Sequence, residues 1–308
     1  MGGTLRRLSS RSRARLHRIA DAVAGRVAVA LLKVIRRFDR AWVSDAAAAF
    51  MRRVGPLMRE HRIGRANLKA AFPDKSDAEI ERILTGVWDN LGRVAAEFAH
   101  LDQICHGDPM KRDFIGYDDA SVERFFRLRG DGKPALIFAA HLANWELPAI
   151  IAHSDGLPTT ILYRRPNLGA VADAVIAIRA GHMGEMEPTG LQAPIKLGRA
   201  LQQGRHVAML VDQHYVKGVE VTFFGRTCRA NPLIAMLARQ VECPIHGTRV
   251  IRLPGHRFRA EISEEIAPIR DADGRIDIQG TMQAITSVIE GWVREHPEQW
   301  LWLHRRWR

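Results

Sequence analysis

From about residue 133 onward, short apolar runs alternate with segments of helical character, and this alternation limits the possible folds more than any other feature. Four runs have the length and composition of buried strands: ALIFAA at 135–140, TTILY at 159–163, VAMLV at 207–211 and PIHGTRVIRL at 244–253. Helical segments are expected between and after them, at 167–181, 194–204, 231–240 and about 276–295. Strands that alternate with helices are typical of an α/β domain with a largely buried sheet.

One stretch departs from that alternation and predicts an antiparallel pair. Residues 248–263, TRVIRLPGHRFRAEIS, contain two strand-like runs separated by Pro254 and Gly255, which favour a turn. The expected fold class is therefore α/β, with a mixed, mostly parallel central sheet flanked by helices and a helical N-terminal region.

Residues 14 to about 107 have the pattern of a mostly helical region. In residues 76–101, Ser76 and Glu79 form a capping-box pattern before apolar residues with helical spacing. Pro73 ends the helix predicted for the preceding ANLKAAF stretch. We therefore expect one domain over residues 41–308, helical to about residue 130 and α/β after it, preceded by a separate segment at 1–40.

The segment at 1–40 is strongly basic. Residues 5–18 carry six arginines and no acid, and between residues 19 and 35 the apolar side chains share one face of a helical wheel. Charges at Asp21, Arg26 and Lys33 make the apolar part too short and too charged to span a bilayer. Such a helix suits the surface of an anionic membrane, and a helix packed on the domain with a solvated basic face fits equally well.

The balance of charge points to anionic partners. The chain has 46 Lys and Arg against 34 Asp and Glu, for a net charge of +12, which favours nucleic acid, an anionic membrane or an acidic carrier protein. Three cysteines without CxxC spacing argue against a disulfide framework and a structural zinc site, and suggest a reducing compartment. The sequence contains no GxSxG, GxxxxGK[ST], GxGxxG or HExxH motif, so serine hydrolase, nucleotide-binding and zincin chemistry are not expected.

Three histidines are followed by an acidic residue five positions later, and sequence context separates them. His256 and Glu261 lie along the predicted hairpin, where an odd separation points two side chains to opposite faces. His182 and Glu187 lie in a stretch broken by glycines and a proline. His141, in the motif HLANWE, follows a predicted buried strand, and ligands collect at the carboxyl ends of strands in α/β sheets.

His141 and Glu146 are therefore the candidates for catalysis. A neutral imidazole is a good base near neutral pH, and a carboxylate on its far nitrogen fixes the tautomer and stabilises the imidazolium. The chemistry that fits is base-assisted attack of a bound hydroxyl on an activated acyl or similar group. From the residues alone, a buried histidine satisfied by a helix-capping glutamate fits equally well.

Five sequence blocks in a fixed order resemble the bacterial lipid A biosynthesis acyltransferases. This family includes lauroyl and myristoyl transferases and is part of the lysophospholipid and glycerophosphate acyltransferase-like superfamily. The blocks are RANLKAAFPDKSDAEIERI, HLANWE, YRRPN, DQHYVKGVEVTFFG and HPEQWLWLHRRWR. The resemblance covers nearly the whole chain after the first fifty residues. It implies transfer of a fatty acyl chain from an acyl carrier protein to a hydroxyl or hydroxyacyl group of a lipid A precursor, without a metal or cofactor.

The resemblance also implies roles for individual residues. His141 deprotonates the acceptor hydroxyl, and Glu146 orients His141 and stabilises its charge. The implied substrate-binding residues are Tyr163, Arg164, Asn167, Arg179, Asp212, Gln213, Arg305 and Arg306. We interpret Trp300, Trp302 and Trp307 of the last block as packing the C-terminus onto the core or as contacts with a membrane interface.

The expected partners are an acyl carrier protein, a lipid A precursor or similar anionic glycolipid, and the cytoplasmic face of the inner membrane. Two alternatives stay open. One is acylation of another glycolipid or a phospholipid, such as a phosphatidylinositol mannoside, with acyl-CoA as the donor. The other is a non-enzymatic basic protein that binds nucleic acid. The dispersed basic residues and the tryptophans gathered near the C-terminus disfavour it, so no nucleic acid is expected as a partner.

Overall fold

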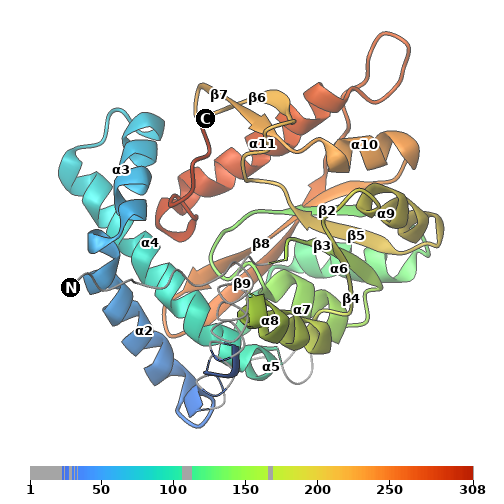
Figure 1. The fold of residues 1–308 in the computed structure, drawn as a ribbon. Helices are drawn as coiled ribbons and strands as arrows, with labels where there is room; N and C mark the ends of the chain where they lie inside the picture. Colours follow the sequence, from blue (N-terminus) through green and yellow to red (C-terminus); the bar gives the residue numbers. More distant parts are fainter. Residues whose placement is uncertain are drawn as a thin grey trace, which may run out of the picture.

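A computed structural model describes residues 23, 25–27, 30, 32, 34–105, 113–165 and 169–307. The strands of its central sheet are β1 (Ile115–Tyr117), β2 (Leu136–Ala139), β3 (Thr159–Tyr163), β4 (Glu185–Pro188), β5 (His206–Leu210), β8 (Ile245–Leu253) and β9 (Arg257–Glu265). Within the described residues they lie in the order β1-β9-β8-β2-β5-β3-β4. Neighbours are parallel except for the antiparallel pair β8–β9. The predicted α/β class with a mixed, mostly parallel sheet is confirmed (Figure 1).

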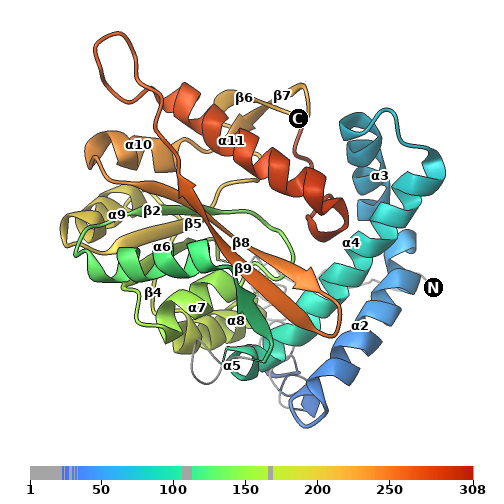
Figure 2. The ribbon, with the colours of Figure 1, turned by 180° about the vertical axis from the view of Figure 1, so that it is seen from behind.

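Helices cover both faces of the sheet (Figures 1 and 2). One face carries α6 (Asp119–Gly130), α7 (Leu147–Ser154) and α8 (Gly169–His182). The other carries α9 (Ala193–Gln202), α10 (Leu233–Gln240) and α11 (Ile278–Glu295). The side chains of Leu136 and Phe138 join the core cluster on the α9–α11 side. Because successive strand residues point to opposite faces, Ile137 and Ala139 of β2 face α6–α8.

The region before the sheet is helical, as predicted. Its helices are α2 (Arg40–Val54), α3 (Arg59–Ala71), α4 (Asp77–Glu97) and the short α5 (Leu101–Ile104). The capping box at the start of α4 is present, because Ser76 and Glu79 exchange side-chain and backbone hydrogen bonds. A Cβ atom at position 92 would lie 2.5 Å from the carbonyl oxygen of Ala47, so Gly92 permits the close approach of α2 and α4.

Most of the segment predicted at 1–40 lies outside the described residues. Where residues between 23 and 35 are described, their backbone is helical. Among the helices of the described chain, none combines the length and the hydropathy that a membrane span requires.

Four strands differ from the sequence-based expectation. β1 starts the sheet at Ile115, although the chain was expected to be helical to about residue 130. With only three residues, β1 is too short to form a recognisable strand pattern. β4 occupies the stretch broken by glycines and a proline, where no strand was expected. It is an edge strand that pairs only with β3 and buries little apolar surface, so its sequence lacks a strand signature. β6 (Val219–Phe223) and β7 (Arg226–Ala230) form a separate antiparallel hairpin.

Candidate active site

A cavity of about 510 Å³ lies between the central sheet and helices α6–α8. Several strand residues in its wall have small side chains, among them Ala139, Ala208, Thr248 and Ala260. These side chains are too short to fill the layer between the sheet and the helices, and the cavity occupies the space that they leave. Hydrophobic side chains make up much of the remaining wall, among them Phe125, Ile151, Ile161 and Met183.

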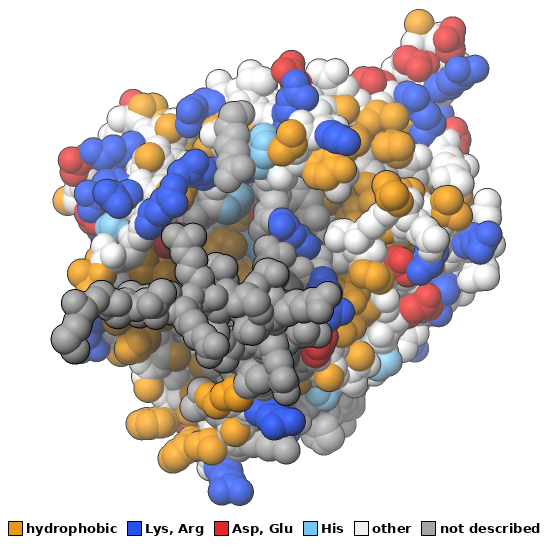
Figure 3. All heavy atoms as spheres, in the orientation of Figure 1, with side chains coloured by type: hydrophobic (Ala, Val, Ile, Leu, Met, Phe, Trp, Pro, Cys, Tyr) orange, Lys and Arg blue, Asp and Glu red, His pale blue; other side chains and the backbone are white. Residues whose placement is uncertain are grey.

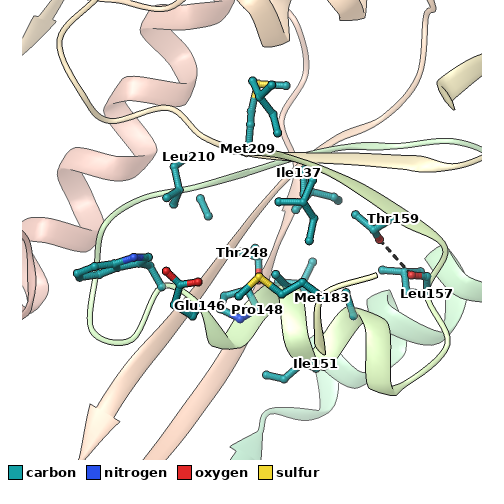
Figure 4. Close-up of a pocket in the computed structure, with 18 of the residues that line it drawn as sticks. Ile137, Glu146, Pro148, Ile151, Leu157, Thr159, Met183, Met209, Leu210 and Thr248 are labelled. Atoms are coloured by element: carbon teal, nitrogen blue, oxygen red, sulfur yellow. Dashed lines mark hydrogen bonds between the residues drawn. The ribbon is translucent and has the colours of Figure 1, made fainter. Parts of the chain in front are cut away.

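The cavity runs along the strands. Figure 4 places Glu146 at one end of it and Leu157 and Thr159 at the other. The wall contributed by β3 and the residues before it extends from Leu157 to Tyr163. Since a strand rises about 3.3 Å per residue, this wall is about 20 Å long. A long, largely apolar space of this kind has the form that one extended hydrocarbon chain needs.

The loop at residues 141–146 follows β2 and is held in a strained shape. Ala143 has a φ of 47°, a left-handed conformation that non-glycine residues rarely adopt. Its N–H donates to the carbonyl of Gln299 at 2.9 Å, and its carbonyl accepts from the side chain of Asn90 at 3.1 Å. Contacts from α4 and from the C-terminal segment therefore fix the loop that carries His141.

Asp212 is the carboxylate that holds His141. It comes shortly after β5, which pairs with β2, and this adjacency brings the two residues together. Nδ1 of His141 lies 2.8 Å from Oδ1 of Asp212, and the backbone N–H of His141 donates to Oδ2, also at 2.8 Å. The side chain of Asp212 is 1% exposed and that of His141 is 14% exposed. The carboxylate is thus shielded from solvent, while the imidazole borders the cavity.

The bond to Asp212 sets the tautomer of His141. An ionised carboxylate only accepts hydrogen bonds, so Nδ1 carries the ring hydrogen and Nε2 keeps its lone pair. Nε2 accepts from the side-chain amide of Gln213 at 3.3 Å. Trp145 packs against the same ring, with 5.2 Å between ring centroids. Nε2 is therefore the ring nitrogen that can accept a proton, once the amide of Gln213 no longer occupies its lone pair.

The surroundings shift the pKa of both groups. Burial alone would lower the pKa of His141, but the charge and hydrogen bond of Asp212, with a contribution from Glu146, raise it above its ordinary value of 6.5. Burial would raise the pKa of Asp212, but the charge and hydrogen bonds of His141 hold it far below its ordinary value of 3.8. Asp212 therefore stays ionised near neutral pH and stabilises an imidazolium at His141.

Glu146 has a different partner from the one predicted. Among the described residues, its carboxylate binds the guanidinium of Arg179, with Nε donating to Oε2 at 2.8 Å and Nη2 to Oε1. Glu146 is the N-cap residue of α7, and Arg179 comes from the neighbouring helix α8. The expected role of Glu146 on Nδ1 of His141 is therefore corrected: Asp212 occupies that position because β2 and β5 are adjacent strands.

The structure brings together only part of the predicted substrate-binding set. Four of its members line the cavity: Tyr163, Arg164, Arg179 and Gln213. Asn167 lies outside the described residues. Arg305 is exposed and away from the cavity wall. Arg306 is 2% exposed, with its guanidinium over the ring of Phe223 at 5.4 Å. The substrate-binding role expected for Arg306 is therefore corrected to a buried packing contact.

Trp300 belongs to the site, whereas its sequence block predicts only packing or contact with a membrane interface. Its indole N–H donates to Oδ2 of Asp212 at 2.8 Å. The two residues are 88 positions apart, and no local pattern connects them. Trp145 was also missed, but its place inside the HLANWE motif was a usable signal. In the described part of the chain, no group of three or more His, Cys, Asp or Glu side chains is arranged to hold a metal ion.

Comparison with known proteins agrees with the resemblance seen in the sequence. Residues 13–308 match the family described as bacterial lipid A biosynthesis acyltransferase. A relative from Haemophilus influenzae, named lipid A biosynthesis acyltransferase, is 24% identical, and the match covers 77% of this chain and 72% of the relative. The protein is an acyltransferase. Because the family match spans nearly all of the chain, it belongs to the bacterial lipid A biosynthesis acyltransferase family.

Proposed function

We propose that the protein transfers a fatty acyl chain from an acyl carrier protein thioester to a hydroxyl group of a lipid A precursor, with His141 as the general base. One observation carries the proposal: His141 borders the apolar cavity, while its Nδ1 is held by the buried carboxylate of Asp212. Family membership supports the reaction type and the class of acceptor.

The proposed acyl transfer involves His141, Asp212, the acceptor hydroxyl and the thioester of the donor. Nε2 of His141 takes the proton of the acceptor hydroxyl as the hydroxyl oxygen attacks the thioester carbonyl carbon. A C–O bond forms, the C–S bond breaks, and the departing thiolate takes the proton back from His141. The products are an ester and a free thiol, and the imidazole is neutral again. Asp212 stabilises the transient imidazolium and keeps Nε2 directed at the reacting groups.

The donor chain would lie in the cavity, with the thioester carbon near His141. Across the middle of the cavity, Ile137, Ala208 and Ile161 are direct neighbours on three adjacent strands. Beyond them, Leu157 and Thr159 border the end far from Glu146 (Figure 4). An apolar wall of this length favours a long acyl chain over a short one, because each buried methylene contributes about 0.8 kcal/mol.

Two arginines give the cavity a means of holding an anionic glycolipid. Arg164 follows β3, and Arg179 projects from α8, and both line the cavity. Glu146 holds Arg179 on one side, and the ring of Phe98 lies 5.9 Å from its guanidinium carbon. A guanidinium fixed in this way retains N–H groups suited to phosphate or sugar oxygens. We propose that Glu146 sets the direction of Arg179.

The cytoplasmic surface of the inner membrane is the proposed place of action. On and near α2, hydrophobic side chains are exposed to solvent: Phe38 by 51%, Trp42 by 62% and Phe50 by 60%. Figure 3 shows hydrophobic and basic side chains together on the face of the molecule where α2 lies, at the lower left. This combination, with the net charge of +12, suits an anionic leaflet and an acidic carrier protein.

A comparison of donors and variants tests the proposal. The full-length chain in detergent micelles is given a lipid A precursor and one acyl chain, carried either by acyl carrier protein or by CoA, and the products are identified by mass spectrometry. We expect an acylated glycolipid from the carrier protein donor, and a loss on the order of a hundredfold or more in His141→Ala. His182→Ala serves as the control, since His182 precedes an acid at the same spacing but does not line the cavity.

Each part of the proposal has its own contradicting result. Wild-type turnover in His141→Ala would exclude the mechanism. Failure of the wild type to acylate the glycolipid from either donor would exclude the acceptor. Preference for CoA, or activity only on a phospholipid or on a phosphatidylinositol mannoside, would favour the alternative substrates instead.

A further inference from the structure

We propose that Trp300 is a positioning residue of the active site: its indole N–H holds the carboxylate of Asp212 in the orientation that His141 requires. The inference rests on the proposed function, in which His141 is the base. It gives the C-terminal segment at residues 299–301 a part in the reaction, beyond packing against the core.

The hydrogen bonds of Asp212 carry the argument. Oδ1 faces Nδ1 of His141, whereas Oδ2 accepts from the backbone N–H of His141 and from Nε1 of Trp300, each at 2.8 Å. With three donors around its two oxygens, the carboxylate has a single orientation that satisfies all three hydrogen bonds. Without the indole N–H, Oδ2 would keep a single donor in a place where burial excludes water, and the carboxylate could turn about its bond to Nδ1, so that Nε2 would no longer be held toward the reacting groups.

Trp300 is itself held rigidly. Its side chain is 1% exposed, and its ring lies edge-to-face against Trp302 at 4.7 Å and against Phe223 at 5.5 Å between centroids. Aromatic contacts of this geometry fix the plane of the indole. The N–H therefore has a defined direction, which a flexible donor such as a lysine or serine would not provide.

The backbone around Trp300 is joined to the loop that carries His141. Leu142 and Trp300 form an antiparallel bridge. The N–H of Leu301 donates to the carbonyl of His141 at 3.1 Å, and the N–H of Ala143 donates to that of Gln299 at 2.9 Å. Consequently, the segment at 299–301 is tied to His141 through its backbone and to Asp212 through Trp300. This segment therefore sets the position of Asp212 relative to His141.

Loss of the indole N–H has a predictable effect on proton affinity. The negative charge of Asp212 would be shared with one donor fewer, so it would attract a proton on His141 more strongly. Among the described residues, the other ionisable groups that act on the pair are Glu146 and Arg179 on the cavity side, and His304 and Arg306 on the C-terminal side. Trp300→Phe leaves all four in place, so a change in the pKa of His141 would report on the indole bond.

The chain contains a matched control for this test. Trp302 is buried to the same degree, and its indole N–H also makes one hydrogen bond of 2.8 Å, but to the carbonyl of Pro297. Trp300→Phe and Trp302→Phe therefore remove the same atoms and a bond of the same length, two residues apart. Only Trp300→Phe removes a bond to Asp212.

The two variants are compared in the acyl transfer assay across pH, using the full-length chain. For Trp300→Phe we expect a fall in kcat on the order of tenfold or more, because the lost bond is to a charged group. The KM values should change by less than about twofold, and the acid limb of the kcat profile should move to higher pH. Trp302→Phe should leave the midpoint of that limb unchanged. Equal kcat values and equal midpoints in the two variants would overturn the proposal.

Two further measurements separate this inference from the proposed function and from loss of folding. NMR titration of His141 reports its pKa without acyl transfer, and a rise in Trp300→Phe but not in Trp302→Phe is expected. In the wild type, the indole N–H signal of Trp300 should shift with the same midpoint as His141, and that of Trp302 should shift less. If the indole N–H signal of Trp300 in the wild type did not shift as His141 titrates, the positioning role would be contradicted. This test holds even if Trp300→Phe does not fold. Absence of glycolipid acylation by the wild type would overturn only the proposed function.

Discussion

Asp212 accepts two hydrogen bonds from one residue, His141: one from the backbone N–H and one from Nδ1 of the ring, each at 2.8 Å. The backbone bond fixes where Asp212 lies relative to the loop, and the ring bond fixes the tautomer. The imidazole of His141 is therefore oriented by the same carboxylate that anchors its loop. This double contact has consequences for activity that can be measured.

Activity of the wild type should rise with pH through a midpoint above 6.5. Only the neutral imidazole accepts a proton, and the pKa of His141 is raised above its ordinary value by Asp212 and Glu146 against the effect of burial. The base is therefore lost as the pH falls through this raised pKa. A kcat profile at saturating glycolipid measures the midpoint, and a midpoint at or below 6.5 would contradict the assignment of His141 as the base.

Asp212→Asn should abolish most activity and move the acid limb of the kcat profile to lower pH. The amide keeps the shape of the carboxylate but removes the charge, so burial lowers the pKa of His141 with less opposition. We expect kcat to fall at least about a hundredfold, since the imidazolium also loses its counter-charge. The pH profile of the variant provides the measurement. A limb that stays at the wild-type pH would mean that Asp212 does not act on His141.

Glu146→Gln and Arg179→Gln should both raise the KM for the glycolipid, but should shift the acid limb of the kcat profile in opposite directions. Either change breaks the ion pair that directs Arg179, so the KM for the glycolipid should rise about tenfold or more in both. The carboxylate of Glu146 raises the pKa of His141, and the guanidinium of Arg179 lowers it. The acid limb should therefore move to lower pH in Glu146→Gln and to higher pH in Arg179→Gln.

The control for these two variants is Arg165→Gln, which breaks an exposed ion pair with Asp173. Exposed pairs contribute little, so its kinetic constants should stay close to those of the wild type. If Glu146→Gln and Arg179→Gln shifted the limb in the same direction, Glu146 would have a role other than the one proposed.

Ala208→Phe should shorten the acyl chain that the enzyme prefers. Ala208 lies on β5 between Ile137 and Ile161, and its small side chain leaves the middle of the cavity open. A phenylalanine there would separate the half near His141 from the end bordered by Leu157. Competition between carrier proteins loaded with different chains measures the preference. Ala272→Phe, in an exposed turn, is the control, and unchanged selectivity in Ala208→Phe would place the chain elsewhere.

Serine substitutions at Phe38, Trp42 and Phe50 should weaken binding to anionic vesicles. These side chains are at least half exposed, and transfer of one large apolar side chain out of water contributes about 1.5–3 kcal/mol. The triple variant should lose at least tenfold in vesicle affinity, measured by co-sedimentation at constant salt. Met236→Ser with Ile269→Ser, two exposed hydrophobic positions elsewhere, is the control. Equal binding by both variants would rule out α2 as the membrane-facing element.

Local sequence patterns determined most elements of this protein. The capping box at Ser76 and Glu79 begins α4 where expected. The apolar runs became β2, β3, β5 and β8, and the turn at Pro254 and Gly255 joins β8 to β9. Such signals could be read because helix caps, buried strands and turns depend on residues close together in the chain. The position of His141 at the carboxyl end of β2 follows from the same local information.

The partners of that histidine depended on the tertiary structure. The spacing within HLANWE suggested Glu146, yet the side chain on Nδ1 belongs to Asp212, 71 positions away. Strand order decides this contact: β5 lies beside β2, and no local pattern specifies which strands become neighbours. Trp300 reaches Asp212 only because the C-terminal segment pairs with the loop after β2. The raised pKa of His141 depends on burial and on charges from distant segments, and both exist only once the chain has folded.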